Sequence, residues 1–341
     1  MMKTIGIVGL GPMGLRYVEV MKKMEQIKLA VVDLRQEAIQ QVKERQLKHE
    51  VVAYSSHADM LQHEQLDVLI IATNGPSHYP IYLDAVKHGV KRIICEKPIA
   101  TSIAQAREMV EIARAEGITL AVNHGRRWSK DYVSLREKLR SGIIGSVESI
   151  MFSMGGGQMG CNGTHFIDLA GYLLEQNVVQ VCGFLNDENI ANPRGANFKD
   201  PGGYAIVHFE AGARMFFEMA EDLGIPPLMV INGKCGRVTI NEIERFYLIE
   251  TRNEDDWALP VTRYGTPLRR VEKEKLELDI HALSHDLLQA VFQDEAPADP
   301  EYAVKALEAV IGIHLSHEKG NKQIALPIAD EECINRLFKF T

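Results

Sequence analysis

The segment from Thr4 to Asp33 constrains the fold more than any other part of the chain. A short apolar run over residues 5–8 leads into three glycines at GxGxxG spacing. A helix-like segment follows, and a second apolar run over residues 29–32 ends at Asp33. A strand, a glycine turn, a helix, a strand and an acidic residue in this order are typical of a dinucleotide-binding unit.

Each glycine of this turn has a separate physical role. Gly9 permits the tight turn after the strand, Gly11 lets the backbone approach a pyrophosphate, and Gly14 lets the helix lie against the sheet. The phosphate charge would meet the positive end of the helix dipole. A turn that only packs is the alternative, but the flanking strands favour a cofactor. The expected contacts are Gly9, Gly11, Pro12, Met13 and Gly14.

The residues after the second strand predict which dinucleotide binds. Asp33 can accept hydrogen bonds from the adenosine ribose hydroxyls and would repel a 2′-phosphate, which favours NAD over NADP. We expect Leu34 and Arg35 to contact the same end of the cofactor. Arg35 keeps NADP open as a lesser alternative, because an arginine nearby can accommodate the 2′-phosphate.

Up to about residue 122, short apolar runs alternate with helical patterns. Such fully apolar strands are what a parallel sheet with both faces covered requires, so we predict a doubly wound Rossmann domain over residues 1–122. The predicted strands are residues 5–8, 29–32, 51–54, 68–72, 93–95 and 119–122, and the predicted helices are 13–24, 36–46, 57–63, 78–88 and 102–116.

Ligands on such a sheet bind beyond the carboxyl ends of the strands. Two further strand ends therefore become candidates, and the first contributes Thr73, Asn74 and His78 as expected cofactor contacts. The second carries Lys97, whose ammonium could exchange a proton with a substrate oxygen if it were partly desolvated. A surface lysine beside a turn is the alternative interpretation of Lys97.

From residue 123 the pattern changes to longer, alternating runs rich in β-branched residues. Alternation of this kind fits a mostly antiparallel sheet with two different faces, so we predict a second α/β domain over residues 123–341. The predicted strands are 147–154, 178–185, 205–209, 215–219, 228–231, 238–240 and 246–250, with irregular strands within 253–275 and helices at 281–293 and 301–318.

Composition excludes several classes of function. The net charge of -8 argues against a nucleic-acid partner, which would need a concentrated basic patch. The five cysteines include no CxxC pair, so we expect reduced thiols and no metal site. No segment reaches the roughly 20 apolar residues of a membrane span, and no cleavable leader is evident. We therefore expect a cytoplasmic protein without a membrane partner.

The ordered motifs GLGPMG, CEKP, NHGRRW, THFID and LEAVIGIHLSHEKGNKQIALP resemble those of the Gfo/Idh/MocA oxidoreductases. The resemblance runs from the first strand to about Pro327. It implies a Rossmann domain with bound NAD(H) or NADP(H). It also implies a C-terminal α/β domain with a large, mostly antiparallel open sheet, which binds substrate and oligomerises. It also implies sugar, cyclitol or nucleotide-sugar substrates, and a homodimer or homotetramer that buries the open face of the sheet.

The same resemblance assigns roles to individual residues. Lys97 matches the lysine that contacts the reacting hydroxyl, and Glu96 matches the acid near the nicotinamide ribose. His165 matches the histidine that removes or returns the substrate proton. The implied substrate contacts are Asn123, Arg126, Arg127, Trp128, Asn162 and His165. Packing explains the arginines and Trp128 equally well, so both interpretations stay open.

His165 also fits this role from its own surroundings. Thr164 could cap a helix, leaving the imidazole in the first turn, where the positive helix end favours a neutral base. Asp168 could orient the ring or could simply serve the helix end. Members of the family usually carry an aspartate four residues before this histidine, but here the residue is Cys161. A small packing residue is the simplest interpretation of that thiol.

Three functions are compatible with these residues. The favoured one is an NAD-dependent oxidoreductase that moves hydride between a carbohydrate hydroxyl carbon and nicotinamide. The second is a redox-neutral enzyme that retains its NAD. The third is a regulator that binds NAD without turnover, which the loss of the aspartate at Cys161 keeps open and which the presence of Lys97 and His165 argues against.

Overall fold

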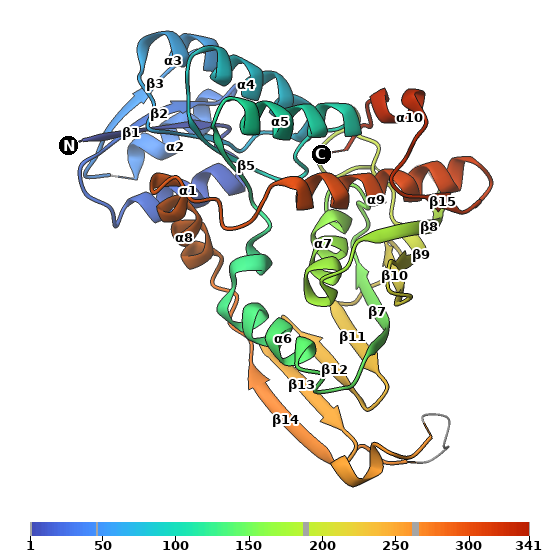
Figure 1. Cartoon of the computed structure of the whole chain (residues 1–341). Helices are drawn as coiled ribbons and strands as arrows, with labels where there is room; N and C mark the ends of the chain where they lie inside the picture. Colours follow the sequence, from blue (N-terminus) through green and yellow to red (C-terminus); the bar gives the residue numbers. More distant parts are fainter. Residues whose placement is uncertain (1, 46, 187–190, 261–265, 341) are drawn as a thin grey trace. The chain divides into compact units, whose positions relative to one another are not determined.

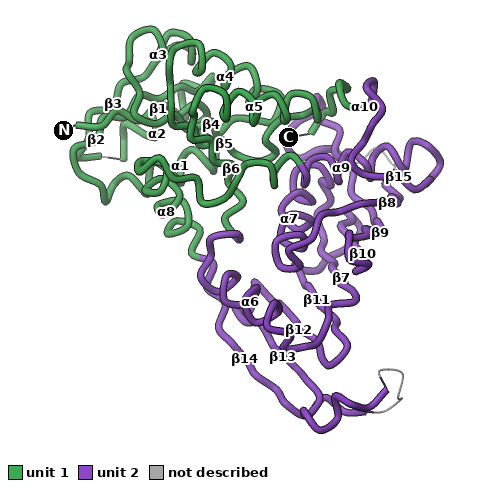
Figure 2. Tube along the Cα trace, viewed as in Figure 1, with its two compact units in different colours: residues 1–125, 279–304, 334–341 green, residues 126–278, 305–333 purple. Residues whose placement is uncertain are grey.

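The computed structural model describes residues 2–45, 47–186, 191–260 and 266–340 (Figure 1). The chain divides into two compact units, which Figure 2 shows in green and purple. Unit 1 comprises residues 1–125, 279–304 and 334–341, and unit 2 comprises residues 126–278 and 305–333. The first division lies close to the predicted boundary at residue 122. The two later segments of unit 1 return to it from the far end of the chain, which no local pattern predicted.

Unit 1 contains a six-stranded sheet in the order β3-β2-β1-β4-β5-β6. Every neighbouring pair is parallel, as the uniformly apolar strands require, and the predicted doubly wound architecture is confirmed. The strand order reverses between β1 and β4, so the carboxyl ends of these two strands mark the switch point. The strands are β1 (Lys3–Val8), β2 (Ile27–Val32), β3 (Glu50–Ala53), β4 (Val68–Ile71), β5 (Arg92–Cys95) and β6 (Thr119–Val122).

The helices of the doubly wound part lie between these strands and match the predicted segments closely. Ser56 and Ser102 cap α3 and α5 by accepting N–H groups of their first turns. The helix predicted from residue 78 begins at Gly75, because Pro76 suits a first turn. The helices are α1 (Pro12–Met21), α2 (Gln36–Glu44), α3 (His57–His63), α4 (Gly75–Lys87) and α5 (Ile103–Ala115).

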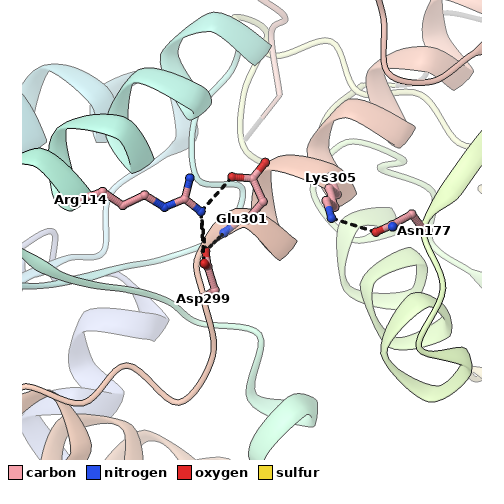
Figure 3. A network of polar contacts seen from close by, with 5 residues as sticks. All are labelled: Arg114, Asn177, Asp299, Glu301 and Lys305. Carbon is pink, nitrogen blue, oxygen red and sulfur yellow. Dashed lines mark hydrogen bonds and ion pairs between the residues drawn. The ribbon is translucent and has the colours of Figure 1, made fainter.

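The segment 279–304 adds two helical elements to unit 1. Helix α8 (Ile280–Phe292) packs against α1, and α9 (Glu301–Glu318) begins in this unit. Figure 3 shows how the start of α9 is tied to α5 by Arg114, whose Nη2 lies 3.0 Å from Asp299 Oδ1 and 3.2 Å from Glu301 Oε2. Because Arg114 is half exposed, this network orients the segment more than it stabilises it.

Unit 2 contains a nine-stranded sheet in the order β14-β13-β12-β11-β7-β10-β9-β8-β15. Only β7 and β10 pair in parallel, so the predicted mostly antiparallel sheet is confirmed. The strands are β7 (Val147–Gly155), β8 (Val178–Leu185), β9 (Gly203–Phe209), β10 (Arg214–Ala220), β11 (Leu228–Gly233), β12 (Gly236–Asn241), β13 (Phe246–Thr251), β14 (Arg270–Lys275) and β15 (Ile324–Ala325).

The charged stretch 253–275 differs from the irregular strands predicted there. It holds a short 3-10 helix, η2 (Glu254–Asp256), and then β14, which pairs with β13 in regular register. Its residues 261–265 lie outside the described part of the chain. The remaining elements of unit 2 are η1 (Gly125–Trp128), α6 (Lys130–Arg140), α7 (Gly163–Leu174), the second part of α9 and α10 (Glu331–Asn335).

The two faces of the large sheet carry different side chains. On one face, the ring of Phe152 lies 4.2 Å from that of Phe166 in α7 and 5.2 Å from that of Phe217, measured between centroids. These three rings form part of the core beneath the helices. On the opposite face, Phe216 and Met151 are paired in register and remain 44% and 55% exposed. One face is therefore packed and the other presents apolar side chains.

Among the described residues, no helix combines the length and the apolar character needed to cross a bilayer.

Candidate functional site

The glycine turn after β1 has the shape that a dinucleotide requires. Gly9 has φ +95°, and a Cβ there would lie 2.6 Å from the carbonyl oxygen of Ala72. A Cβ on Gly14 would lie 1.9 Å from the Gly9 oxygen, whereas a Cβ on Gly11 would meet no atom within 4 Å. Gly11 is also the N-cap of α1 and has no side chain to occupy the first-turn N–H groups. The helix start is thus open to an anion.

Asp33 lies beside this turn at the end of β2. Its Oδ2 accepts the Leu10 N–H at 2.7 Å, and its Oδ1 accepts the backbone N–H and the Nε–H of Arg35 at 2.8 and 3.0 Å. Burial alone would raise the pKa of Asp33, but the hydrogen bonds from Arg35 and Leu10 together hold it below its usual value. Leu34 is 96% exposed. An ionised carboxylate is therefore fixed at the predicted ribose position.

His78 connects the two other strand ends. Its Nδ1 lies 2.8 Å from the carbonyl oxygen of Pro98, and its Nε2 lies 3.2 Å from that of Thr73. The ring is fully buried, and this burial lowers the pKa of His78 despite the carbonyl contacts. These contacts support a bracing role for His78, while Asn74, the exposed N-cap of α4, offers polar atoms at the surface.

The residue that precedes Lys97 belongs to a buried polar cluster. Asn123 Nδ2 donates to Glu96 Oε1 at 2.8 Å and lies 3.1 Å from the hydroxyl oxygen of Tyr17. Burial raises the pKa of Glu96, although the Asn123 hydrogen bond opposes that change. Burial and the neighbouring carboxylate also raise the pKa of Tyr17 well above its usual value. The Asn123 amide nitrogen, predicted to contact substrate, is hydrogen-bonded within unit 1.

Lys97 itself is half-buried at the end of β5. Strand β5 pairs with β4, and β4 pairs with β1, so Lys97 lies on the same sheet edge as the glycine turn. Its peptide bond to Pro98 is cis.

Sequence reasoning missed Tyr17, because a tyrosine on the buried side of α1 gives no signal beyond an ordinary core position.

In unit 2, His165 lies half-buried in the first turn of α7. The predicted cap at Thr164 is wrong, because the helix begins at Gly163 and Asn162 is its N-cap. The Thr164 hydroxyl instead donates to the carbonyl oxygen of Cys161 at 3.0 Å. Asn162 already has helical dihedrals, and its side chain makes no capping hydrogen bond. Its amide nitrogen lies 3.5 Å from the Gly157 carbonyl oxygen.

The two arginines of the predicted substrate segment form buried ion pairs. Arg127 Nε lies 2.8 and 2.9 Å from the two carboxylate oxygens of Asp168, which is 1% exposed. Arg126 binds Glu242 at 2.6 Å through both Nε and Nη2. Burial would raise the pKa of Glu242, but Arg126 lowers it below its usual value. These contacts support the packing interpretation of both arginines.

Trp128 ends η1 and is half-buried. Sequence reasoning missed a buried carboxylate, Asp200, that binds the backbone of the turn preceding α7. Asp200 is 6% exposed and accepts the backbone N–H groups of Gly160 and Cys161 at 2.5 and 2.8 Å. Asp200 lies in a loop far from Gly160 and Cys161 in the sequence, and no local motif marks it.

The part of the chain that the structure describes contains no group of three or more His, Cys, Asp or Glu residues placed to hold a metal ion.

Comparison with known proteins agrees with this geometry. Residues 3–124 match the family described as oxidoreductase family, NAD-binding Rossmann fold, known as GFO_IDH_MocA. These residues therefore belong to the Gfo/Idh/MocA family, and the predicted resemblance is confirmed. The matched range contains the glycine turn, Asp33 and Lys97. The NAD-binding class of the fold is established, and it fits the open helix start at Gly11.

Curated relatives include the myo-inositol 2-dehydrogenase of Thermotoga maritima, which is 21% identical over 271 residues, covering 74% of this chain and 79% of that protein. An uncharacterized oxidoreductase of Escherichia coli is 31% identical over 97 residues, or 28% of each chain. The alignment thus spans little more than a quarter of that relative.

Solved structures match over nearly the full length. An oxidoreductase domain protein from Kribbella flavida superposes with a TM-score of 0.79 at 18% identity, covering 96% of this chain and 100% of that one. The transcriptional regulator Gal80p from Kluyveromyces lactis superposes with a TM-score of 0.74 at 15% identity, covering 95% and 91%. Both similarities extend the shared fold to unit 2.

The two glycines of the turn predict separable effects. We expect Gly11→Ala to unfold like the wild type but to bind NADH at least about 10-fold more weakly, because its methyl group enters the open phosphate position. Gly14→Ala should lose about 1–3 kcal/mol of stability, because its methyl group meets the Gly9 carbonyl. Thermal unfolding and NADH fluorescence titration measure the two effects. Wild-type NADH affinity in Gly11→Ala would contradict this assignment.

Proposed function

We propose that the protein is an NAD-dependent dehydrogenase that acts on a secondary hydroxyl of a cyclitol, sugar or nucleotide sugar. The observation that carries the proposal is the placement of Lys97 on the sheet edge that also holds the glycine turn and Asp33. A dinucleotide site alone would not need an ammonium group there. The name of the Thermotoga relative, a myo-inositol 2-dehydrogenase, supports a cyclitol or sugar substrate.

Unit 1 would hold the cofactor through the turn at Gly9, Gly11 and Gly14, with Asp33 on the adenosine ribose. When bound, NAD supplies the acceptor for the hydrogen that leaves the substrate carbon with its electron pair. The proposed contacts at the opposite end are Thr73, Asn74 and Glu96. Their placement at the ends of β4 and β5 supports this assignment.

Lys97 and His165 are the proposed catalytic residues. In the oxidation direction the substrate loses a hydroxyl proton while its carbon–hydrogen bond breaks, and a ketone forms. His165 accepts that proton, and the ammonium of Lys97 stabilises the developing negative charge on the oxygen. The first-turn position of His165 supports its role, because the positive helix end favours the neutral imidazole that a base requires. Asn162, at the same helix start, is the proposed substrate contact.

Replacement of Lys97 tests this mechanism. We expect Lys97→Ala to lower kcat at least about 100-fold while NADH affinity stays within about 2-fold, because the lysine acts on the substrate oxygen. Lys91→Ala is the matched control, since Lys91 is an exposed lysine of the same unit, and it should keep normal turnover. Steady-state kinetics with a polyol substrate measure both variants. Normal turnover in Lys97→Ala would refute the mechanism.

The proposed cofactor is NAD in preference to NADP. Asp33 is held as an anion, and Arg35 lies against it with its side chain 61% exposed. We expect Asp33→Ala to raise the ratio of NADP to NAD activity at least about 10-fold, because repulsion is lost and Arg35 can meet the 2′-phosphate. Asp59→Ala, which removes a carboxylate from α3, should leave the ratio unchanged. An unchanged ratio in Asp33→Ala would instead argue that cofactor choice lies elsewhere.

We also propose that a second copy of the chain covers the open face of the nine-stranded sheet, giving a homodimer or homotetramer. The apolar side chains Ile206, Phe216, Met151 and Val230 follow one another in register across four neighbouring strands. Exposed apolar rows of this kind mark protein interfaces more often than solvent surfaces.

Light scattering tests this interface. We expect the wild type to be an oligomer and Phe216→Glu to shift it toward a monomer, because a charge would be buried in the apolar row. Leu337→Glu, at an exposed leucine of unit 1, should leave the mass unchanged. A monomeric wild type would overturn the proposal.

A regulator is the second candidate function. The Gal80p structure supports it, since a protein titled a transcriptional regulator shares this fold. A regulator would bind NAD without oxidising any member of a polyol panel, and it would tolerate Lys97→Ala. A redox-neutral enzyme with retained NAD would differ from both, because it would consume substrate with no net change in the reduced cofactor.

A further inference from the structure

The turn that leads into α7 is fixed by a carboxylate from a distant loop. Asp200 accepts two consecutive backbone N–H groups, one on each oxygen, from Gly160 at 2.5 Å and Cys161 at 2.8 Å. Its side chain is buried, with only 6% of the residue exposed. Because these N–H groups directly precede the N-cap Asn162, Asp200 determines where the first turn of the helix begins.

Further contacts join the same two segments. The Met159 N–H donates to the Pro201 carbonyl at 3.2 Å, and the Gly202 N–H donates to Glu221 Oε1 at 2.6 Å. A Cβ on Gly202 would lie 2.7 Å from the Cα of Gly157. The loop around Asp200 is therefore packed directly on the backbone before α7, which leaves the carboxylate little freedom to move.

The negative charge of Asp200 offsets the positive end of the α7 dipole. The positive end of a helix disfavours a protonated histidine in its first turn, whereas a nearby carboxylate favours it. His165 follows Cys161 by four residues, and its backbone N–H lies 3.1 Å from the Asn162 carbonyl within that turn. A buried negative charge at the Cys161 backbone is thus placed to raise the proton affinity of the imidazole.

The other charged groups around α7 include two ion pairs. Asp168 is paired with Arg127, and Arg126, whose guanidinium carbon lies 4.7 Å from the Phe166 ring centroid, is paired with Glu242. Glu221 accepts the Gly202 N–H, and its side chain also lies against Gly157. Because each ion pair contains one positive and one negative charge, neither pair adds a net charge near the first two turns of α7.

We propose that Asp200 is a positioning residue for His165, fixing the turn before α7 and supplying the negative charge that balances the helix end. The consequence for catalysis rests on the proposed function, because it assumes that His165 transfers the substrate proton. A base of raised proton affinity takes that proton more readily. The effect on the imidazole itself is independent of turnover and can be measured in the cofactor-free protein.

The direct test is an NMR titration of the histidines, with the His165 signal assigned by its loss in His165→Asn. We expect Asp200→Asn to lower the pKa of His165 by about one unit, because the nearby negative charge is removed. The asparagine keeps the side-chain shape but can accept only one of the two backbone N–H groups. Glu221→Gln is the matched control. It removes a carboxylate that contacts the same loop and lies against Gly157 but does not accept the Gly160 or Cys161 N–H groups, so the His165 pKa should stay near its wild-type value.

A double variant that moves the carboxylate from residue 200 to residue 161 tests the same idea more strictly. Cys161→Asp in the Asp200→Asn background restores one carboxylate at the same turn, and we expect it to recover most of the lost shift. An unchanged or raised His165 pKa in folded Asp200→Asn would overturn the proposal. If thermal unfolding shows that Asp200→Asn does not fold, the His165 pKa is measured in the single variant Cys161→Asp. It adds a second carboxylate and should raise the His165 pKa, and no change there would also overturn the proposal.

Kinetics separate this inference from the proposed function. In an active enzyme we expect Asp200→Asn to lower kcat about 10-fold with KM within about 2-fold, and to move the acidic limb of the kcat profile to lower pH. A purely structural role would lower the unfolding temperature and leave that limb in place. A wild type without dehydrogenase activity would refute the proposed function, while the NMR titration would still decide the role of Asp200.

Discussion

The close approach of α1 to the end of β1 is the constraint on which the rest of unit 1 depends. A side chain at Gly14 would overlap the Gly9 carbonyl, so the helix can lie this near only because residue 14 is glycine. That approach points the open first turn of α1 at the carboxyl edge of the sheet. Asp33 is bound to the same turn through the Leu10 N–H, and the edge continues to Lys97.

The two arginines that follow the Rossmann part of unit 1 pair with buried carboxylates. Arg126 and Arg127 have the residue type expected of a substrate clamp, yet both are bound to buried carboxylates. Removing either partner would leave an uncompensated charge in the interior, which is strongly destabilising. Lys97 and His165, the proposed catalytic residues, are half-buried and lie at a strand end and a helix start, where groups that meet substrate are commonly placed.

The sequence predicted the features that depend on local pattern. Apolar runs and glycine spacing located the strands of both sheets. A strand buried on one face alternates apolar and polar residues, and a strand buried on both faces is apolar throughout, so burial determines the sequence pattern. The sequence did not predict that Asn162 and not Thr164 would stand at the N-cap position of α7, since the preceding backbone is bound by Asp200 from a loop far along the chain. The Tyr17–Asn123–Glu96 cluster was missed for the same reason, as its members come from three separate elements.

The central claim is that a polyol carbon gives up its hydrogen to the nicotinamide ring. The most direct measurement follows a deuterium label from the carbinol carbon of a panel of cyclitols and sugars into the cofactor by mass spectrometry. The account predicts deuterium in the reduced nicotinamide with at least one member of the panel. Tight binding of NAD with no transfer of label from any member would contradict it and would favour the regulator.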